Sequence, residues 1–316
     1  MSKAESKIEE SINLFRINLK PNTTELNRLL EFCLSDPKEQ YVIIGWCYIY
    51  PDNEKTFDSY EDYYAEVRKS IKRMNPALNI FRDTKENDLF WTRDRKGHYW
   101  ICRAKGGPIS MCKKEFDIGA AVPVEAYLVG IDVPGGIRAT FTRANGGAAQ
   151  RIYDEKLHKY SKYVFNQVSK RDHYEKSIIE NENIVENLPA FDLEELVISY
   201  IQIKHDYYIL SNSIANRSTT PGIECILHSR IKNNPDKAVV QVKAGKNLLN
   251  ADDFVTYLDE GYKVFLYASN YSNMDQSQNV VFIKEQELID FYYEYRVNLP
   301  KSISQWENLL SWTPLS

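Results

Sequence analysis

The feature that most restricts the fold of this 316-residue chain is a pair of alternating segments on either side of a turn. Residues 222–228 have the sequence GIECILH, residues 238–243 have the sequence AVVQVK, and NNPD lies between them at 233–236. Asn, Pro and Asp favour turns, and alternating apolar and polar side chains are typical of strands. The pattern predicts a β-hairpin with one apolar face that must pack on a core.

Three polar side chains fall on this hairpin where two paired strands can bring them together. Gln241 and Lys243 are two residues apart and share a face of their strand, while Glu224 alternates with its apolar neighbours. Mg²⁺ takes hard oxygen ligands, and an ammonium group stabilises charge that develops on a phosphate. The hairpin therefore predicts a metal-dependent phosphodiesterase site. The alternative is a surface hairpin on which Glu224 and Lys243 form a cross-strand pair.

This region resembles the PD-(D/E)xK nuclease superfamily and, within it, the Mrr-like restriction endonucleases, where Gln often replaces the acidic residue of the third motif. Glu224 stands where the superfamily has Asp, Gln241-Val242-Lys243 stands for (D/E)xK, and Glu194 stands for the Glu of the first helix. The resemblance implies that Glu194, Glu224, Gln241 and Lys243 are catalytic. It also implies that Glu224, Gln241 and Glu194 bind Mg²⁺, for which Mn²⁺ can substitute. Gln241 removes a negative charge from this metal site.

The elements around the hairpin support the resemblance. A helix is expected at 192–204, strands at 207–211 and 262–268, and a second helix at 251–260. With the hairpin, they give the order α-β-β-β-α-β, which is the core of that superfamily. The resemblance implies a restriction-endonuclease-like fold for residues 189–316.

Residues 40–152 show a different pattern, in which short strands predominate. We expect a buried strand at 41–50, a helix at 60–73, a hairpin at 88–103, and further strands near 122–129 and 136–142. This succession predicts a small, curved β-barrel with a helix packed on it.

The segments IGW at 44–46 and DLFWTRD at 88–94 resemble the PUA-like group that includes the EVE and YTH domains. The resemblance implies that one nucleotide is turned out of its stack and held in an aromatic pocket that senses a chemical modification. Stacking between rings would restore the energy that a flipped base loses. The candidate pocket residues are four aromatic side chains and two polar neighbours: Trp46, Tyr48, Trp91, Trp100, Thr92 and Asp94. The alternative is that most of these aromatic residues are barrel core.

Basic residues outnumber acidic residues between positions 68 and 114. Arg93, Arg95 and Lys96 in this stretch, and Lys246 close to the hairpin, are expected to contact the nucleic-acid backbone. The alternative is a solvated surface, which is the usual fate of a run of charges. The formal net charge of −4 argues against indiscriminate coating of nucleic acid but allows a local basic face.

These patterns predict a chain of mixed class, α/β and α+β, with two folded domains. The expected organisation is a helical extension at 1–39, a PUA-like reader at 40–152, a connecting helix and linker at 153–188, and a nuclease domain at 189–316.

Several classes of protein are disfavoured by what the sequence lacks. The five cysteines show neither Cys-x-x-Cys nor zinc spacing, and they suit buried thiols in a reducing compartment. No apolar run approaches membrane-spanning length and no secretory signal is present, so a cytoplasmic protein without a membrane partner is expected. Because no glycine-rich phosphate-binding motif occurs, no nucleoside triphosphate is expected as a ligand.

Together these features predict a modification-dependent DNA endonuclease of the type IV restriction class, which serves in phage defence. Its partner would be double-stranded DNA that carries a modified base, and cutting both strands predicts a homodimer. Three alternatives stay open: a nuclease of a defence system that is directed at RNA, a nuclease for unmodified sites, and a catalytically inactive nucleic-acid-binding protein.

Overall fold

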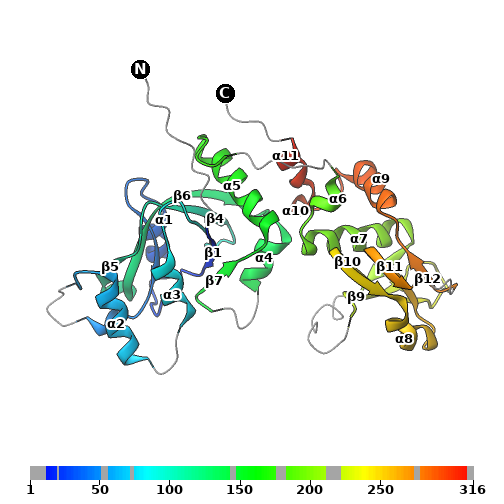
Figure 1. Ribbon diagram of the computed structural model, residues 1–316, viewed down its shortest axis with the longest axis horizontal. Coiled ribbons are helices and arrows are strands. Elements are labelled where there is room, and N and C mark those ends of the chain that lie inside the picture. The colour runs from blue at the N-terminus through cyan, green and yellow to red at the C-terminus, as the bar shows by residue number, and fades with distance from the viewer. Residues whose placement is uncertain are drawn as a thin grey trace, which may run out of the picture. The chain divides into compact units, whose positions relative to one another are not determined.

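The structure, a computed structural model, describes residues 12–19, 21–50, 56–71, 75–142, 147–175, 183–210, 222–273 and 278–311. The chain divides into two compact units, one formed mainly by residues 1–178 and the other by Ile179–Ser311. Each unit combines helices with a curled sheet, so the chain is of mixed α and β class (Figure 1). Within the described residues, no helix has both the length and the apolar character needed to cross a bilayer.

The first unit is built on a seven-stranded sheet in the order β2-β6-β4-β3-β1-β7, with β5 also paired to β6. Its elements are β1 (Leu14–Ile17), α1 (Leu26–Leu34), β2 (Gln40–Ile44), η1 (Cys47–Ile49), α2 (Tyr60–Ser70), α3 (Pro76–Asp83), β3 (Leu89–Arg93), β4 (Tyr99–Ala104), β5 (Ile109–Lys113), η2 (Lys114–Phe116), β6 (Ile118–Gly130), α4 (Gly135–Thr142), β7 (Ala149–Ile152) and α5 (Glu155–Ser169). The sheet curls strongly (Figure 1). Among the described strands, no ladder joins its ends at β2 and β7, so a closed barrel stays a prediction.

Residues 14–17 correct the expected helical extension at 1–39. They form β1, which pairs in parallel with β3 and antiparallel with β7. All four residues are buried, and both edges of the strand are paired. A short apolar run can belong to a buried strand or to a helix, and periodicity alone does not separate the two. The helix expected in the following stretch is present as α1.

Two strands expected in the first unit differ in the structure: one is a helix and the other is shorter. The strand expected at 136–142 is the helix α4, where Gly136 allows close packing because a Cβ there would lie 2.8 Å from Leu157 Cδ1. The strand expected at 41–50 ends at Ile44, because the chain turns at Gly45 and at Trp46, whose φ is +68°. Gly45 and Trp46 line a cavity of the first unit.

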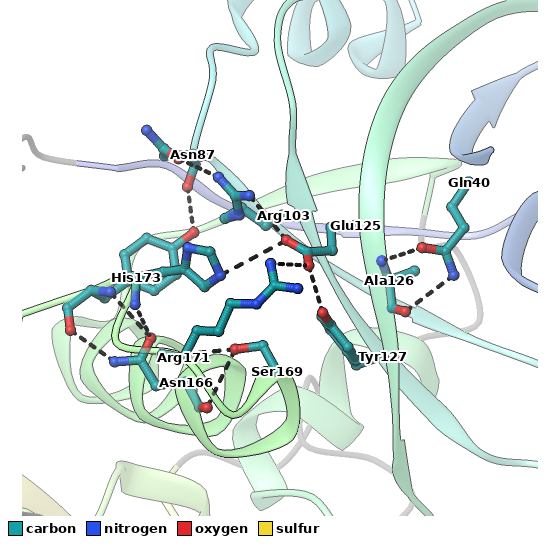
Figure 2. Close-up of polar contacts among 11 residues, drawn as sticks. Gln40, Asn87, Arg103, Glu125, Ala126, Tyr127, Asn166, Ser169, Arg171 and His173 are labelled. Carbon is teal, nitrogen blue, oxygen red and sulfur yellow. Dashed lines mark hydrogen bonds and ion pairs between the residues drawn. The ribbon is translucent and has the colours of Figure 1, made fainter. Parts of the chain in front are cut away.

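Helix α5, which was expected to connect the two domains, packs on β4 and β6 of the first unit. A charged cluster fixes the chain that follows it, as Figure 2 shows. Arg103 of β4 and Arg171, just beyond α5, bind opposite oxygens of Glu125 at 2.9 and 3.2 Å, and the Tyr127 hydroxyl donates to the same carboxylate. These donors, together with Arg103 charge, outweigh burial and hold the pKa of Glu125 below its ordinary value.

The second unit contains a five-stranded sheet in the order β12-β11-β10-β9-β8. Its elements are α6 (Ile184–Asn187), α7 (Ala190–Lys204), β8 (Tyr207–Ile209), β9 (Cys225–Ser229), β10 (Lys237–Asn250), η4 (Ala251–Phe254), α8 (Val255–Asp259), β11 (Lys263–Asn273), β12 (Val280–Phe282), α9 (Glu285–Tyr295), α10 (Lys301–Ser304) and α11 (Trp306–Leu310). Strands β8, β9 and β10 pair antiparallel, whereas β10, β11 and β12 pair parallel.

Strand β10 is the centre of this sheet and is covered on both faces. Val239 packs with Phe254 of η4 and with the strand neighbour Val264 in one apolar cluster. On the opposite face, Val240 is in register with Phe265, whose ring packs on His205 at the end of α7. Figure 1 shows α7 and α9 on one face of the sheet and α8 on the other. Because side chains alternate, Gln241 and Lys243 share the face of Val239, which η4 and α8 cover.

Candidate functional site

The register of the β9–β10 hairpin brings Glu224 beside Gln241. Cys225 is opposite Val240, and the backbone N–H of Glu224 donates to the Val240 carbonyl at 2.7 Å. Gln241 Nε2 then donates to Glu224 Oε1 at 3.0 Å. Two of the residues that the sequence grouped are therefore in direct contact.

The Gln241 amide is fixed with its oxygen free to accept. Its Nε2 also donates to the Val242 carbonyl at 3.0 Å, and the side chain is only 3% exposed. The opposite orientation would place the amide oxygen against two acceptors, so the hydrogen bonds define the orientation. Gln241 Oε1 is buried and has no hydrogen-bond partner among the described residues. A buried acceptor without a partner costs about 1–3 kcal/mol, which is a reason to expect a bound donor or cation.

A cavity of about 570 Å³ lies on this face of the sheet. It is lined by Gly222, Gln241, Lys243, Leu248, Leu249, Asp253, Phe254, Thr256 and Tyr257. Lys243 is half-buried, and no ion pair within 4.0 Å is found for its ammonium group among the described residues. Lys246 is exposed, within the exposed stretch of β10, and does not line the cavity.

The structure does not bring Glu194 to this cavity. It lies on α7, which covers the other face of the sheet, and it is not among the lining residues. Within the described part of the chain, no group of three or more His, Cys, Asp or Glu side chains is arranged to hold a metal ion. The hairpin itself offers two oxygen donors, the Glu224 carboxylate and Gln241 Oε1, which has no hydrogen-bond partner among the described residues. Both are the hard ligands that Mg²⁺ prefers, and waters and phosphate complete its shell in many proteins.

A larger cavity, of about 810 Å³, lies in the first unit and takes in two of the candidate base-pocket residues. It is lined by Asn18, Pro21, Asn22, Ile43, Ile44, Gly45, Trp46, Cys47, Tyr48, Tyr50, Asn75, Lys114, Asp117 and Ala148. Trp46 is half-buried, whereas Tyr48 is 65% exposed. The left-handed conformation of Trp46 is uncommon for a bulky residue, and such conformations concentrate at functional sites.

The Gly45–Cys47 turn is held by groups from other elements. Asp117 accepts the Cys47 N–H at 3.0 Å and the Asn22 N–H at 3.2 Å through its two oxygens. The Tyr63 hydroxyl donates to the Gly45 carbonyl at 2.6 Å. The turn is therefore held in place around the cavity, and Asp117 contributes to it in a way that the sequence did not indicate.

Two of the predicted pocket residues lie in the core instead. Trp91 is fully buried, and its Nε1 donates to Ser161 of α5 at 2.9 Å. Thr92 is also fully buried. Strand β3 lies between β4 and β1, so both of its edges are paired, and α5 packs on the face that carries Trp91.

Asp94 and Trp100 have structural partners in the β3–β4 hairpin. Asp94 accepts from the N–H groups of Lys96 and His98, at 2.8 and 2.9 Å, and from Trp100 Nε1 at 3.3 Å. Burial opposes the charge of Asp94, but these hydrogen bonds hold its pKa below the ordinary value. Trp100 is half-buried and packs against the core of the first unit.

Two of the four predicted backbone contacts line a second cavity in the first unit, of about 540 Å³. Arg93, Asp94 and Arg95 line it, together with Asn18, which also lines the larger cavity. Lys96 does not line it. Asn18 escaped the sequence analysis because residues 1–39 were expected to form a helical extension.

Comparison with known proteins gives little to set beside this geometry. No family model matches the chain, and no curated protein matches it. Among solved structures, it is similar to the DNA modification-dependent restriction endonuclease AspBHI, with 11% identity over 71% of this chain and 68% of that chain. The TM-score is 0.22, a level of likeness from which we draw no argument about fold or function.

Proposed function

We propose that this chain is a Mg²⁺-dependent endonuclease that hydrolyses phosphodiester bonds in double-stranded DNA carrying a modified base. The observation that carries the proposal is the Gln241 amide, which is fixed by Glu224. Its buried oxygen has no hydrogen-bond partner among the described residues, and Gln241 lines the same cavity as Lys243. Such an oxygen suits a hard cation, and a cationic side chain beside it suits a phosphate.

Each residue of the proposed site has a distinct task. Glu224 and Gln241 Oε1 would hold the cation, and the amide hydrogen bond keeps the Glu224 carboxylate oriented. When bound, Mg²⁺ supplies a Lewis acid that neutralises phosphate charge and lowers the pKa of an attacking water. Lys243 stabilises the negative charge that grows on the phosphate as the bond breaks.

The reader function belongs to the first unit in this proposal. The larger cavity would accept a flipped base, with Trp46 and Tyr48 as stacking surfaces. Arg93 and Arg95 line the cavity that shares Asn18 with it, and they would contact the flanking phosphates. Because each site cuts one strand, a homodimer would be needed to cut both.

The proposal is tested by incubating the protein and Mg²⁺ with matched DNAs that contain ordinary, methylated, hydroxymethylated or glucosylated cytosine, and with RNA. We expect cleavage of one modified DNA. Lys243→Ala should lower the rate about 10²–10³-fold while binding is kept, because it removes charge stabilisation at the reacting phosphate.

Lys232→Ala is the matched control, since Lys232 is exposed in the turn before β10 and lies outside the cavity. It should cleave like the wild type. Absence of cleavage of every substrate, by the wild type as well, contradicts the enzymatic function. Cleavage of RNA alone would instead support an RNA-directed nuclease.

A further inference from the structure

Asp253 contributes a carboxylate to the cavity of the second unit that the sequence analysis did not assign. It lies in η4, lines the same cavity as Gln241 and Lys243, and is exposed to solvent. No hydrogen bond or ion pair joins its carboxylate to any described residue. It is thus a charged group that faces the proposed reaction site without a structural partner.

The placement of Asp253 follows from the sequence around it. Strand β10 runs directly into η4, where Asn250 accepts the Asp252 N–H at 3.1 Å and starts the turn. Ala251 and Phe254 are buried against the sheet and anchor η4. Because these two residues point inward, Asp253 remains on the open side, next to Thr256 and Tyr257, which also line the cavity.

The proposed metal site needs a second negative charge. Gln241 is neutral. Among the described residues, Glu224 is the carboxylate that contacts it, and one Glu224 oxygen already accepts the Gln241 amide. Proteins usually bind Mg²⁺ through one or two carboxylates with waters and phosphate oxygens. Glu194, the residue expected to compensate, is on the helix that covers the opposite face of the sheet.

We infer that Asp253 would supply this second carboxylate when a cation is bound, together with Gln241 in the same cavity. The inference rests on the proposed nuclease function. Asp253 would supply the negative charge that the neutral Gln241 does not. Gln241 Oε1, which has no hydrogen-bond partner among the described residues, would be a ligand of the same cation. Gln241, which is almost fully buried, and Asp253, which is exposed, both line the cavity.

The cavity has room for what the inference requires. Lys243 and Asp253 both line it, yet no ion pair within 4.0 Å joins them. A water occupies about 30 Å³ of liquid, so a volume of about 570 Å³ admits a hydrated cation together with a phosphate group. The opposite charges of Lys243 and Asp253 then suit opposite partners, with phosphate at the ammonium group and the cation at the carboxylate.

The test measures binding of Mn²⁺ alone, by titration calorimetry and by the electron paramagnetic resonance signal of free Mn²⁺, in the full-length protein. Asp253→Asn should weaken Mn²⁺ binding about tenfold or more, and Asp253→Glu should restore much of it. The matched control is Asp252→Asn. It removes the same charge at the neighbouring position, whose side chain does not line the cavity. It should change the affinity by no more than about twofold.

The outcomes separate the inference from the function on which it rests. If Glu224→Gln weakens Mn²⁺ binding and Asp253→Asn does not, the role of Asp253 is overturned and the proposed site stands. If Asp252→Asn weakens binding as much as Asp253→Asn, the effect is general electrostatics and the inference is overturned too. If the wild type does not bind Mn²⁺, with or without DNA, both the inference and the proposed function fail.

Discussion

The β9–β10 and β3–β4 hairpins were both expected to carry functional side chains, and the structure treats them differently. In β9–β10 the ladder ends at the Cys225–Val240 pair, and β10 continues beyond it. The residues just past that end, Gln241 and Lys243, border a cavity. In β3–β4 the residues from Leu89 to Trp91 have a strand neighbour on each side, and Trp91 is fully buried. Of these two hairpins, the one whose ladder ends early has candidate side chains on a cavity, and alternation of polar or aromatic residues alone does not indicate that position.

The largest effect should come from Trp91→Ala. The ring is fully buried and its Nε1 is bonded to Ser161, so the substitution leaves a cavity between β3 and α5. We expect the free energy of unfolding, measured by urea denaturation, to fall by about 3–5 kcal/mol. A stable variant that has lost only its preference for modified DNA would return Trp91 to the base pocket and remove the contrast between the hairpins.

A smaller loss is expected from Gln241→Glu without metal. The new carboxylate would meet Glu224 and the Val242 carbonyl, where the amide now donates to both. Like charges in a buried site should lower the free energy of unfolding by about 2–3 kcal/mol in the presence of a chelator. Excess Mg²⁺ should restore much of this stability, because the added charge is then a ligand.

The double variant Glu224→Gln/Gln241→Glu is the matched control, since it exchanges the two groups and keeps the total charge of the wild type. It should be more stable than Gln241→Glu in chelator. An equal loss in both variants, insensitive to Mg²⁺, would show that packing and not charge sets the requirement at position 241.

The Glu125 carboxylate in the first unit contrasts with Gln241 Oε1, because Glu125 accepts hydrogen bonds from donors of the fold itself (Figure 2). Gln241 Oε1 has no such donor among the described residues. Glu125→Gln should lower the free energy of unfolding by about 1–2 kcal/mol at neutral pH. The pKa of Glu125 is lowered in the folded chain, so its contribution is present above the unfolded value of about 4.3 and is lost as pH falls through the folded pKa. Urea denaturation at a series of pH values should show the two proteins converging as pH falls from the unfolded value through the lower folded pKa of Glu125. A constant difference at all pH values would assign the effect to packing.

The hairpin comparison also explains which parts of the molecule could be predicted from sequence. Alternation placed Gln241 and Lys243 on one face, and the hairpin register brought Glu224 to Gln241. The order of elements from α7 to β11 follows the expected α-β-β-β-α-β succession. Assignment of that order to a nuclease superfamily stays a prediction.

What could not be predicted depends on contacts between distant parts of the chain. Strand β1 pairs with β3 and β7, and its burial cannot be recognised from a four-residue segment that includes Arg16. Asn18 reaches two cavities only because β1 lies inside the sheet. The position of Asp253 at the cavity follows from η4, in which Ala251 and Phe254 are buried and Asp253 stays exposed. No motif in the sequence indicates this position.

The smallest effect on stability is expected at Tyr48, which makes it the sharpest test of the larger cavity. Its side chain lines the cavity and is 65% exposed, so Tyr48→Ala should change the free energy of unfolding by no more than about 0.5 kcal/mol. Loss of a stacking ring should nonetheless weaken binding of modified DNA by about 1–3 kcal/mol, measured by fluorescence anisotropy with short duplexes. Tyr153→Ala is the matched control, because Tyr153 is 80% exposed and lines neither cavity of the first unit. If both variants bind modified and ordinary duplexes as the wild type does, the larger cavity is not the reader. Recognition would then have to be sought beside Arg93 and Arg95, where the β3–β4 hairpin turns.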